Sequence, residues 1–198
     1  MTAISEARWR QAQEHEAAYW AQEAKNPEKL WADIDGGHHF TAGVLDIRED
    51  TVGGRSVLDI AGGPYPLDED TRHAQHYIVL DPAEYAQYPE STTHRIRARA
   101  EGWRGDTFDE VWGYNVLQHV VDPAEVMATA RACATQTIRW FDVVDTPIYP
   151  VHPHSISADW LRQEMSKDGW KIVRDIDGSR LLAEGVRQKW VALVSVKA

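Results

Sequence analysis

The amino-acid sequence predicts an α/β fold of three layers, in which a mostly parallel seven-stranded sheet is covered by helices. Three observations predict it. From residue 56 onward, short apolar runs alternate with helical segments, as in a parallel sheet that is buried on both faces. The last two apolar runs follow one another without a helix, which predicts an antiparallel hairpin at one edge. The 198 residues are enough for one ordinary domain with a full core.

The amino-acid composition limits the classes of protein to which this chain can belong. Hydrophobic residues make up 43% of the chain and charged residues 26%, which is typical of a globular protein. The formal net charge of −10 argues against unaided nucleic-acid binding, because an acidic surface repels phosphate backbones. No apolar stretch approaches the 18 residues of a membrane span. The polar residues 1–10 lack the apolar core of a signal peptide, so we expect a cytoplasmic location.

The chain begins with a predicted helical extension. Ala, Glu, Gln and Arg dominate Ser5–Ala24, and its aromatic and alanine side chains roughly share one face, which predicts a helix. A second helix is predicted over Phe40–Asp50, and Gly53-Gly54 closes it. Both precede the first clear strand.

Three strands are predicted in the first half of the sheet. Ser56–Ile60 is an apolar run that stops at a glycine-rich turn. A short polar helix is expected over Leu67–Ala74. The second strand is His76–Leu80, which Asp81-Pro82 ends, and a weaker third strand is Thr93–Ala98.

The second half alternates in the same way. Asp122 and Pro123 provide an N-cap and a first-turn proline for a helix that runs to about Ala134. Ser157 is the expected cap of another helix, Ala158–Lys167. The remaining predicted strands are Phe108–Gly113, Thr137–Val144, Trp170–Ile176 and Lys189–Val196.

The sharpest chemical signal follows the first strand. Ligands of open α/β sheets bind beyond the carboxyl ends of the strands, where Gly62 and Gly63 let the backbone turn tightly beside a ligand. Asp81, 22 residues beyond Asp59, ends the second strand, and its carboxylate can accept hydrogen bonds from both hydroxyls of a ribose. The loop lacks the G-x-G-x-x-G spacing and a P-loop lysine. These features predict a nucleoside cofactor without a pyrophosphate.

With these motifs the chain resembles the class I S-adenosylmethionine-dependent methyltransferases of the small-molecule type. Asp59 matches the acidic residue of their first motif and Gly63 its central glycine, whereas Ala61 and Tyr65 replace the first and last glycines. The resemblance implies a Rossmann-like three-layer sandwich with an antiparallel last strand. It also implies a single domain, with residues 1–54 as an N-terminal helical cap and 55–198 as the cofactor-binding core.

Further stretches match the family in order and spacing: Ile78–Pro82, Ala100-Glu101 and Phe108–Val120. By resemblance, Asp81 binds the ribose, Glu101 lies near the adenine, Tyr114 and Asn115 lie beside the methionine, and His119 begins the next helix. The resemblance implies these cofactor-binding residues: Asp59, Ala61, Gly62, Gly63, Asp81, Pro82, Ala100, Glu101, Tyr114, Asn115 and His119.

Methyl transfer from a sulfonium needs a general base only when the acceptor must lose a proton. The family has no universal base, so titratable groups after the fourth and fifth strands are the candidates. They are His119 and, in the proline-rich loop Asp145–Ser155, Tyr149, His152 and His154. We expect the same three loop residues to contact the substrate, together with Tyr19 and Trp20 of the first helix. Trp31 and the run His38-His39-Phe40 are further candidates for a lid that closes the substrate pocket.

Other chemistries are less well supported. His152 and His154, even with His38-His39, lack an acidic or cysteine partner at a diagnostic spacing, so no metal site is predicted. Cys133 lies among helical alanines and reads as a core residue, which argues against cytosine C5 methylation.

The sequence thus predicts methyl transfer from S-adenosylmethionine to an O or N atom of a small molecule or a protein side chain. The alternative is a non-catalytic module with the same fold that acts as a partner subunit, which Ala61 and Tyr65 motivate. A nucleotide-dependent oxidoreductase ranks lower, because the phosphate-binding glycine fingerprint is missing.

Overall fold

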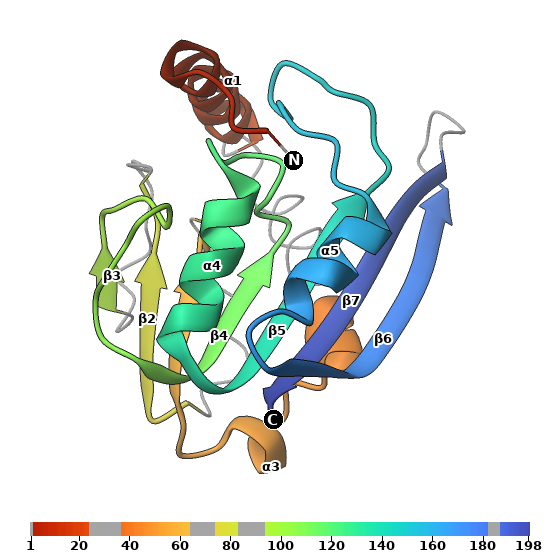
Figure 1. Cartoon of the computed structure of the whole chain (residues 1–198). Coiled ribbons are helices and arrows are strands. Elements are labelled where there is room, and N and C mark those ends of the chain that lie inside the picture. The colour runs from red at the N-terminus through yellow and green to blue at the C-terminus, as the bar shows by residue number, and fades with distance from the viewer. Residues whose placement is uncertain (1, 24–36, 64–73, 83–93, 182–186) are drawn as a thin grey trace.

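The computed structural model describes residues 2–23, 37–63, 74–82, 94–181 and 187–198. Its centre is a seven-stranded sheet in the order β3-β2-β1-β4-β5-β7-β6 (Figure 1). The strands are β1 (Ser56–Ile60), β2 (His76–Leu80), β3 (His94–Ile96), β4 (Phe108–Tyr114), β5 (Ala134–Val144), β6 (Trp170–Leu181) and β7 (Arg187–Lys197).

Five strands are parallel and two are not. β1 pairs in parallel with β2 and β4, and β2–β3 and β4–β5 are also parallel. β7 is antiparallel to β5, and β6 pairs antiparallel with β7 at the sheet edge. This arrangement confirms the predicted fold class and the predicted hairpin. It also places the carboxyl ends of β1, β2 and β4 along one edge, at the top of Figure 1.

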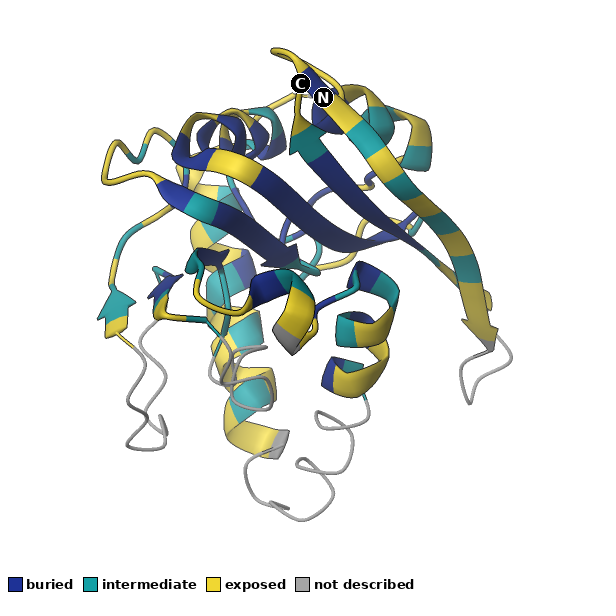
Figure 2. Ribbon diagram, turned by 90° about the horizontal axis from the view of Figure 1, so that it is seen from below, coloured by how far each residue is buried: buried dark blue, intermediate teal, exposed yellow. Residues whose placement is uncertain are grey.

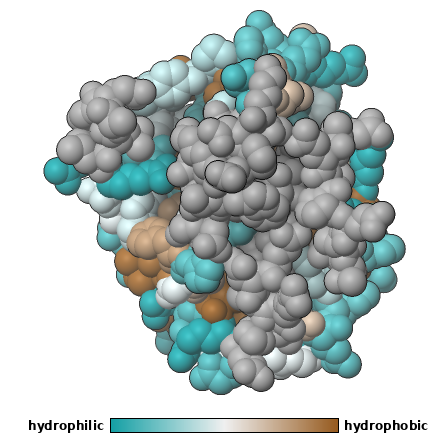
Figure 3. All heavy atoms as spheres, turned by 180° about the vertical axis from the view of Figure 1, so that it is seen from behind, coloured by the Kyte–Doolittle hydropathy of each residue, from teal (hydrophilic) through white to brown (hydrophobic). Residues whose placement is uncertain are grey.

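Helices cover both faces of the sheet. α4 (Pro123–Cys133) and α5 (Ala158–Met165) lie on the front face in Figure 1. A helical segment over residues 37–45 and α3 (Glu49–Val52) lie on the other face, as the view from below shows (Figure 2). Seen from behind, the described surface is mainly hydrophilic, with a smaller apolar area (Figure 3).

Each layer boundary has its own apolar core. Val111 points toward α4 and α5, into a cluster that contains Met127 and Leu161. Its neighbour Trp112 points the other way, into a cluster with Leu45. Successive side chains of a strand alternate between faces, so a strand that is buried on both sides must be apolar throughout. This is the reason why the second half of β4, residues 111–114, has no charged side chain.

The predicted helix caps are confirmed. The Asp122 carboxylate accepts hydrogen bonds from the backbone N–H groups of Ala124 (2.9 Å) and Glu125 (3.3 Å), with Pro123 in the first turn. Ser157 Oγ accepts one from Trp160 N–H at 3.2 Å. These bonds satisfy N–H groups that have no partner within the helix.

Some predicted boundaries were wrong. The helix predicted over Phe40–Asp50 is two helices, because Asp46 adopts a left-handed conformation with φ of 57°. Ile47 N–H then bonds to Ala42 O at 2.8 Å, as at a helix C-terminus. β5 begins at Ala134, three residues early, and β6 extends to Leu181. Apart from Ala74, the helix predicted over Leu67–Ala74 lies outside the described residues.

A buried charged network joins the sheet to the back layer. Glu110 on β4 accepts two hydrogen bonds from Arg139 on β5, with Nε at 2.7 Å and Nη2 at 3.2 Å, and also pairs with Arg55. Arg139 Nη1 donates to the carbonyls of Leu45 (2.6 Å) and Asp46 (3.1 Å) at the end of the helical segment 37–45. The network therefore fixes the C-terminus of that helical segment against the sheet.

Candidate functional site

Helix α1 (Glu6–Glu23) lies across the carboxyl edge of the sheet (Figure 1). It is attached mainly by polar contacts. Arg8 donates to the carbonyls of Tyr149 (2.8 Å) and Pro150 (2.9 Å), and Trp9 Nε1 donates to His119 O at 3.0 Å. These contacts tie α1 to the loops that follow β4 and β5.

Between α1 and the sheet edge lies a cavity of about 670 Å³, within the size range of small-molecule sites. All predicted site residues line it except Asp59, Tyr149 and His154. The predicted residues in its lining are Tyr19, Trp20, Ala61, Gly62, Gly63, Asp81, Pro82, Ala100, Glu101, Tyr114, Asn115, His119 and His152. Trp31 and Tyr65 lie outside the described residues.

The turn after β1 is held open toward the cavity. Ala61 and Gly63 both have left-handed backbones, with φ of 55° and 63°. A Cβ built at Gly63 would meet no atom within 4 Å among the described residues, so there is space above the turn for a ligand. Arg95 Nη1 donates to Gly63 O at 2.7 Å and fixes the turn from the side of β3.

Asp59 lies beneath this turn and does not line the cavity. Its carboxylate is fully buried and accepts a hydrogen bond from the Tyr77 hydroxyl. A Cβ at Gly62 would lie 2.6 Å from Asp59 Oδ2, so the close approach of this carboxylate requires glycine there. Asp59 therefore acts on the cavity through the shape of the turn.

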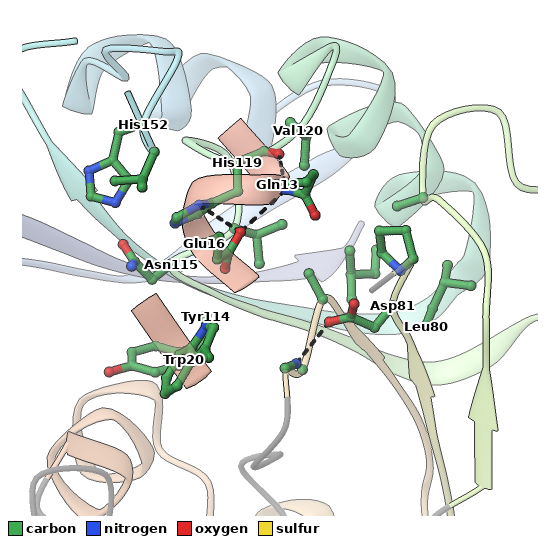
Figure 4. Close-up of a pocket in the computed structure, with 18 of the residues that line it drawn as sticks. Gln13, Glu16, Trp20, Leu80, Asp81, Tyr114, Asn115, His119, Val120 and His152 are labelled. Atoms are coloured by element: carbon green, nitrogen blue, oxygen red, sulfur yellow. Dashed lines mark hydrogen bonds and ion pairs between the residues drawn. The ribbon is translucent and has the colours of Figure 1, made fainter. Parts of the chain in front are cut away.

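Two carboxylates line the cavity at neighbouring strand ends. Asp81, 6% exposed, accepts a hydrogen bond from Gly63 N–H at 3.0 Å, which couples the end of β2 to the glycine turn (Figure 4). Glu101 accepts hydrogen bonds from the N–H groups of Val121 (2.6 Å) and Asp122 (3.3 Å). Glu101 thus orders the loop between β4 and α4 as well as lining the cavity.

The end of β4 supplies Tyr114 and Asn115. Asn115 has a φ of 55°, a conformation that asparagine tolerates better than most residues. Its side chain accepts from Gln118 Nε2 at 3.1 Å, and Gln118 also donates to Asp142 Oδ1 at 3.3 Å. Burial raises the pKa of Asp142 to about 6. No local pattern in the sequence marks the side chains of Gln118 and Asp142, so this buried network is visible only in the structure.

The resemblance implied that His119 begins the next helix, and this prediction is wrong. His119 lies in a turn four residues before α4, which starts at Pro123. Its Nδ1 lies 3.3 Å from Glu16 Oε2 on α1, and Gln13 Nε2 donates to the same carboxylate oxygen at 3.2 Å (Figure 4). The sequence did not single out Glu16 as a site residue, because one more acidic residue on a polar helix carries no local signal.

His152 lies next to this pair, and its ring centroid is 4.7 Å from that of His119. Burial alone would raise the pKa of Glu16, but the charge of His119 holds it below the ordinary value. Burial likewise opposes the charged form of His119, but the carboxylates of Glu16, Asp142 and Asp81 together more than offset it, so the pKa of His119 is raised. Burial and the neighbouring positive charge lower the pKa of His152 to about 4. In this group of three, Glu16 therefore favours the charged form of His119, whereas His152 is a neutral imidazole at neutral pH.

The loop after β5 directs its candidate residues to different places. His152 lines the cavity, whereas Tyr149 is 47% exposed and reaches only the edge of the His152 ring, with centroids 6.3 Å apart. His154 is buried and bonds through Nε2 to Val120 O at 2.9 Å. His154 thus anchors the loop to the turn that carries His119.

The described residues hold no group of three or more His, Cys, Asp or Glu side chains that could bind a metal ion. None of the helices in the described part of the chain is long and apolar enough to cross a membrane. Cys133 is buried, as predicted.

Comparison with known proteins gives the fold but no close relative. No family model matches the chain, and no curated protein matches its sequence. Solved structures do match. A possible histamine N-methyltransferase from Thermotoga maritima has a TM-score of 0.67 at 11% identity, over 96% of this chain and 100% of that chain.

Two further solved structures are similar to this chain. A 1,6-didemethyltoxoflavin N1-methyltransferase from Burkholderia thailandensis, with substrate and S-adenosylhomocysteine bound, has a TM-score of 0.66 at 10% identity, over 100% of this chain and 92% of that chain. The [4+2]-cyclase SpnF has a TM-score of 0.63 at 12% identity, over 81% and 80%. The chain therefore has the fold of class I methyltransferases, and the cyclase illustrates that this fold alone does not determine the reaction.

Proposed function

We propose that this protein binds S-adenosylmethionine and transfers its methyl group to an O or N atom of a small molecule. The supporting observation is that the glycine turn after β1, the carboxylate that ends β2 and the polar end of β4 line one cavity. Structural neighbours of this fold hold S-adenosylmethionine or S-adenosylhomocysteine. Helix α1 covers the cavity, which favours a small acceptor over a side chain of a docked protein.

The residues present suit this cofactor. No atom of the described residues would lie within 4 Å of a Cβ at Gly63, and a glycine there presents backbone rather than side chain to a ligand. In this proposal Asp81 binds the ribose hydroxyls, while Ala100 and Glu101 border the adenine. Tyr114 and Asn115 lie beside the methionine portion, and Pro82 flanks the ribose. When bound, the cofactor supplies an electrophilic methyl group on a sulfonium.

The chain's own contribution to the reaction is to position the acceptor and receive its proton. His152 is a neutral imidazole in the cavity wall, so it can accept a proton from an O–H or N–H group of the acceptor. His119 pairs with Glu16, which favours the charged form of the imidazole, and its ring packs edge to face against the ring of His152. Tyr19 and Trp20 of α1 provide aromatic surface over the acceptor.

Calorimetric titration with S-adenosylhomocysteine tests the cofactor assignment. We expect wild-type protein to bind it, and Asp81→Ala to weaken binding by about 1–3 kcal/mol, the scale of hydrogen bonds to a charged acceptor. Asp106→Asn, a change to an exposed acid that does not line the cavity, is the matched control and should bind like the wild type. Absence of binding by folded wild-type protein would overturn the proposal. Binding without transfer to any acceptor would favour the non-catalytic alternative.

A further inference from the structure

The cations around the cavity differ in how they are paired. Two arginines line it among the described residues, Arg99 and Arg180. Arg99 pairs with Glu6 at 2.5 Å and lies 5.1 Å from the ring centroid of Trp9. His119 is paired with Glu16. Arg180 is an exposed residue that lines the cavity, and no carboxylate lies within ion-pair distance of it in the part of the chain that the structure describes.

The geometry of Arg180 suits capture of a planar anion. Arg180 on β6 lies directly opposite Gln188 on β7 in the sheet register. Its Nε donates to Gln188 Oε1 at 2.6 Å, which orients the guanidinium, and no hydrogen bond from Nη1 or Nη2 to another described residue is present. Two parallel N–H donors match the two oxygens of a carboxylate. Because residue 188 is a neutral amide, it orients the arginine without neutralising it.

Aromatic rings also line the cavity. Tyr19 and Trp20 meet edge to face at a centroid distance of 5.5 Å, and His38 and Tyr114 do so at 5.9 Å. Arg180 is close enough to Tyr114 for its charge to favour the ionised phenol, although burial dominates and raises the pKa of Tyr114 overall. Aromatic walls favour a flat aromatic ligand.

We propose that the methyl acceptor is an aromatic small molecule that carries a carboxylate, and that Arg180, oriented by Gln188, binds this carboxylate. The proposal rests on the proposed function for the identity of the reaction, but the anion site can be tested without it. The competing source of a carboxylate is the amino-acid part of the cofactor, and the experiment separates the two.

The test uses matched probes followed by NMR titration, with and without saturating S-adenosylhomocysteine. The probes are 4-hydroxybenzoate against 4-hydroxybenzamide, and 4-aminobenzoate against 4-aminobenzamide. In wild-type protein we expect each acid to bind about tenfold or more tightly than its amide, which is a difference of about 1.4 kcal/mol. In Arg180→Gln the difference should vanish. It should also vanish in Gln188→Glu, where the new carboxylate takes up the guanidinium.

Arg187→Gln is the matched control. Arg187 lies on the same hairpin but bonds to Ser179 Oγ at 3.0 Å and does not line the cavity, so this variant should keep the preference for acids. Equal binding of acids and amides, no binding of either acid, or a preference that survives Arg180→Gln would overturn the proposal.

A second arm compares S-adenosylhomocysteine with 5′-methylthioadenosine, which lacks the carboxylate. If Arg180→Gln weakens only the former, Arg180 belongs to the cofactor site and the acceptor proposal is wrong. The proposed function fails separately, if wild-type protein binds the acids but neither nucleoside.

Discussion

Ala61 occupies a backbone conformation that glycine adopts at lower cost. Its φ of 55° lies in the left-handed region, where a Cβ costs about 1–2 kcal/mol. The loss of the first family glycine at this position therefore leaves the turn in place and adds local strain. In this turn, Ala61 N–H still donates a hydrogen bond to Leu80 O at 2.7 Å. The substitution is thus no argument by itself against a working cofactor turn.

Ala61→Gly should accordingly stabilise the protein. We expect the free energy of unfolding to rise by up to about 1 kcal/mol, since relief of strain exceeds the extra flexibility of glycine in the unfolded chain. Ala128→Gly, an exposed position in the interior of α4, is the control and should instead lose about 0.5–1 kcal/mol. Urea denaturation measures both, and a similar loss in both variants would contradict the strain at residue 61.

Glu16 controls the charge state of two histidines. In Glu16→Gln, the charge that offsets the burial of His119 is removed, so we expect the pKa of His119 to fall from its raised value. Glu16 also favours the charged form of His152, so the pKa of His152, about 4 in the wild type, loses a contribution that raises it. Imidazole NMR resonances followed against pH measure both values. Glu14→Gln, an exposed neighbour on the same helix, should leave them unchanged.

The sign of the pH dependence follows from these directions. A histidine with a raised pKa contributes stability below about pH 6.5, and this contribution is lost as the pH rises through its folded value. His152 acts in the opposite sense, because its lowered pKa makes the folded state lose stability as the pH falls from about 6.5 toward 4. If His119 titrates identically in wild type and Glu16→Gln, the ion pair does not exist in solution.

At the scale of elements, β4 and β5 share the buried carboxylate of Glu110. Arg139 is 4% exposed, so removal of the carboxylate would leave its charge buried and poorly compensated. We expect Glu110→Gln to lower the free energy of unfolding by about 3–5 kcal/mol. The double variant Glu110→Leu with Arg139→Met should lose less than Glu110→Gln, because the lone charge that remains, on Arg55, is 33% exposed rather than buried. A loss below about 1 kcal/mol in Glu110→Gln would show that the network contributes little.

Helix α1 is held differently from the rest of the molecule. Among its described side chains only Ala12 is buried, so hydrogen bonds and ion pairs rather than an apolar face attach it. Elements with few buried apolar contacts open at a lower free energy than the core. We therefore expect α1 amides to exchange faster with solvent than those of β4 and β5.

Arg8→Ala tests this attachment. It removes two hydrogen bonds to the loop after β5, so the opening free energy of α1 should fall by about 1–2 kcal/mol, with little effect on β5. Hydrogen exchange measures the change, and Arg10→Ala, an exposed change on the same helix, is the control. Uniform acceleration across the sheet would instead indicate global destabilisation.

At the scale of the whole molecule, the cavity lies where α1, the parallel sheet edge and the β6–β7 hairpin meet. A ligand bound there stabilises the folded state by mass action, by about 2.7 kcal/mol at a concentration 100 times its Kd. For a protein of this size that corresponds to a rise in Tm of roughly 5–10 °C. We expect S-adenosylhomocysteine to produce this shift at that ratio and NAD to produce none. A shift with NAD alone would favour the oxidoreductase.

Much of this architecture was predictable because its signals are local. β1 and β2 have the predicted bounds, since apolar runs end at glycine, proline or aspartate. The caps at Asp122 and Ser157 depend on residues within three positions of the helix start. The lengths of the strands were less predictable than their positions. β6 extends to Leu181 because β7 pairs with it, a contact that no local pattern in the polar stretch after Ile176 reveals.

By itself, then, the sequence determined the order of elements, the parallel sheet with its antiparallel hairpin, and the strand-end residues such as Gly63 and Asp81. These follow from periodicity and from turn residues a few positions apart. Only the tertiary structure decided that Glu16 meets His119, that His152 rather than His154 faces the cavity, and that Arg180 reaches it. Such contacts join residues far apart in the chain, and packing of whole elements brings them together.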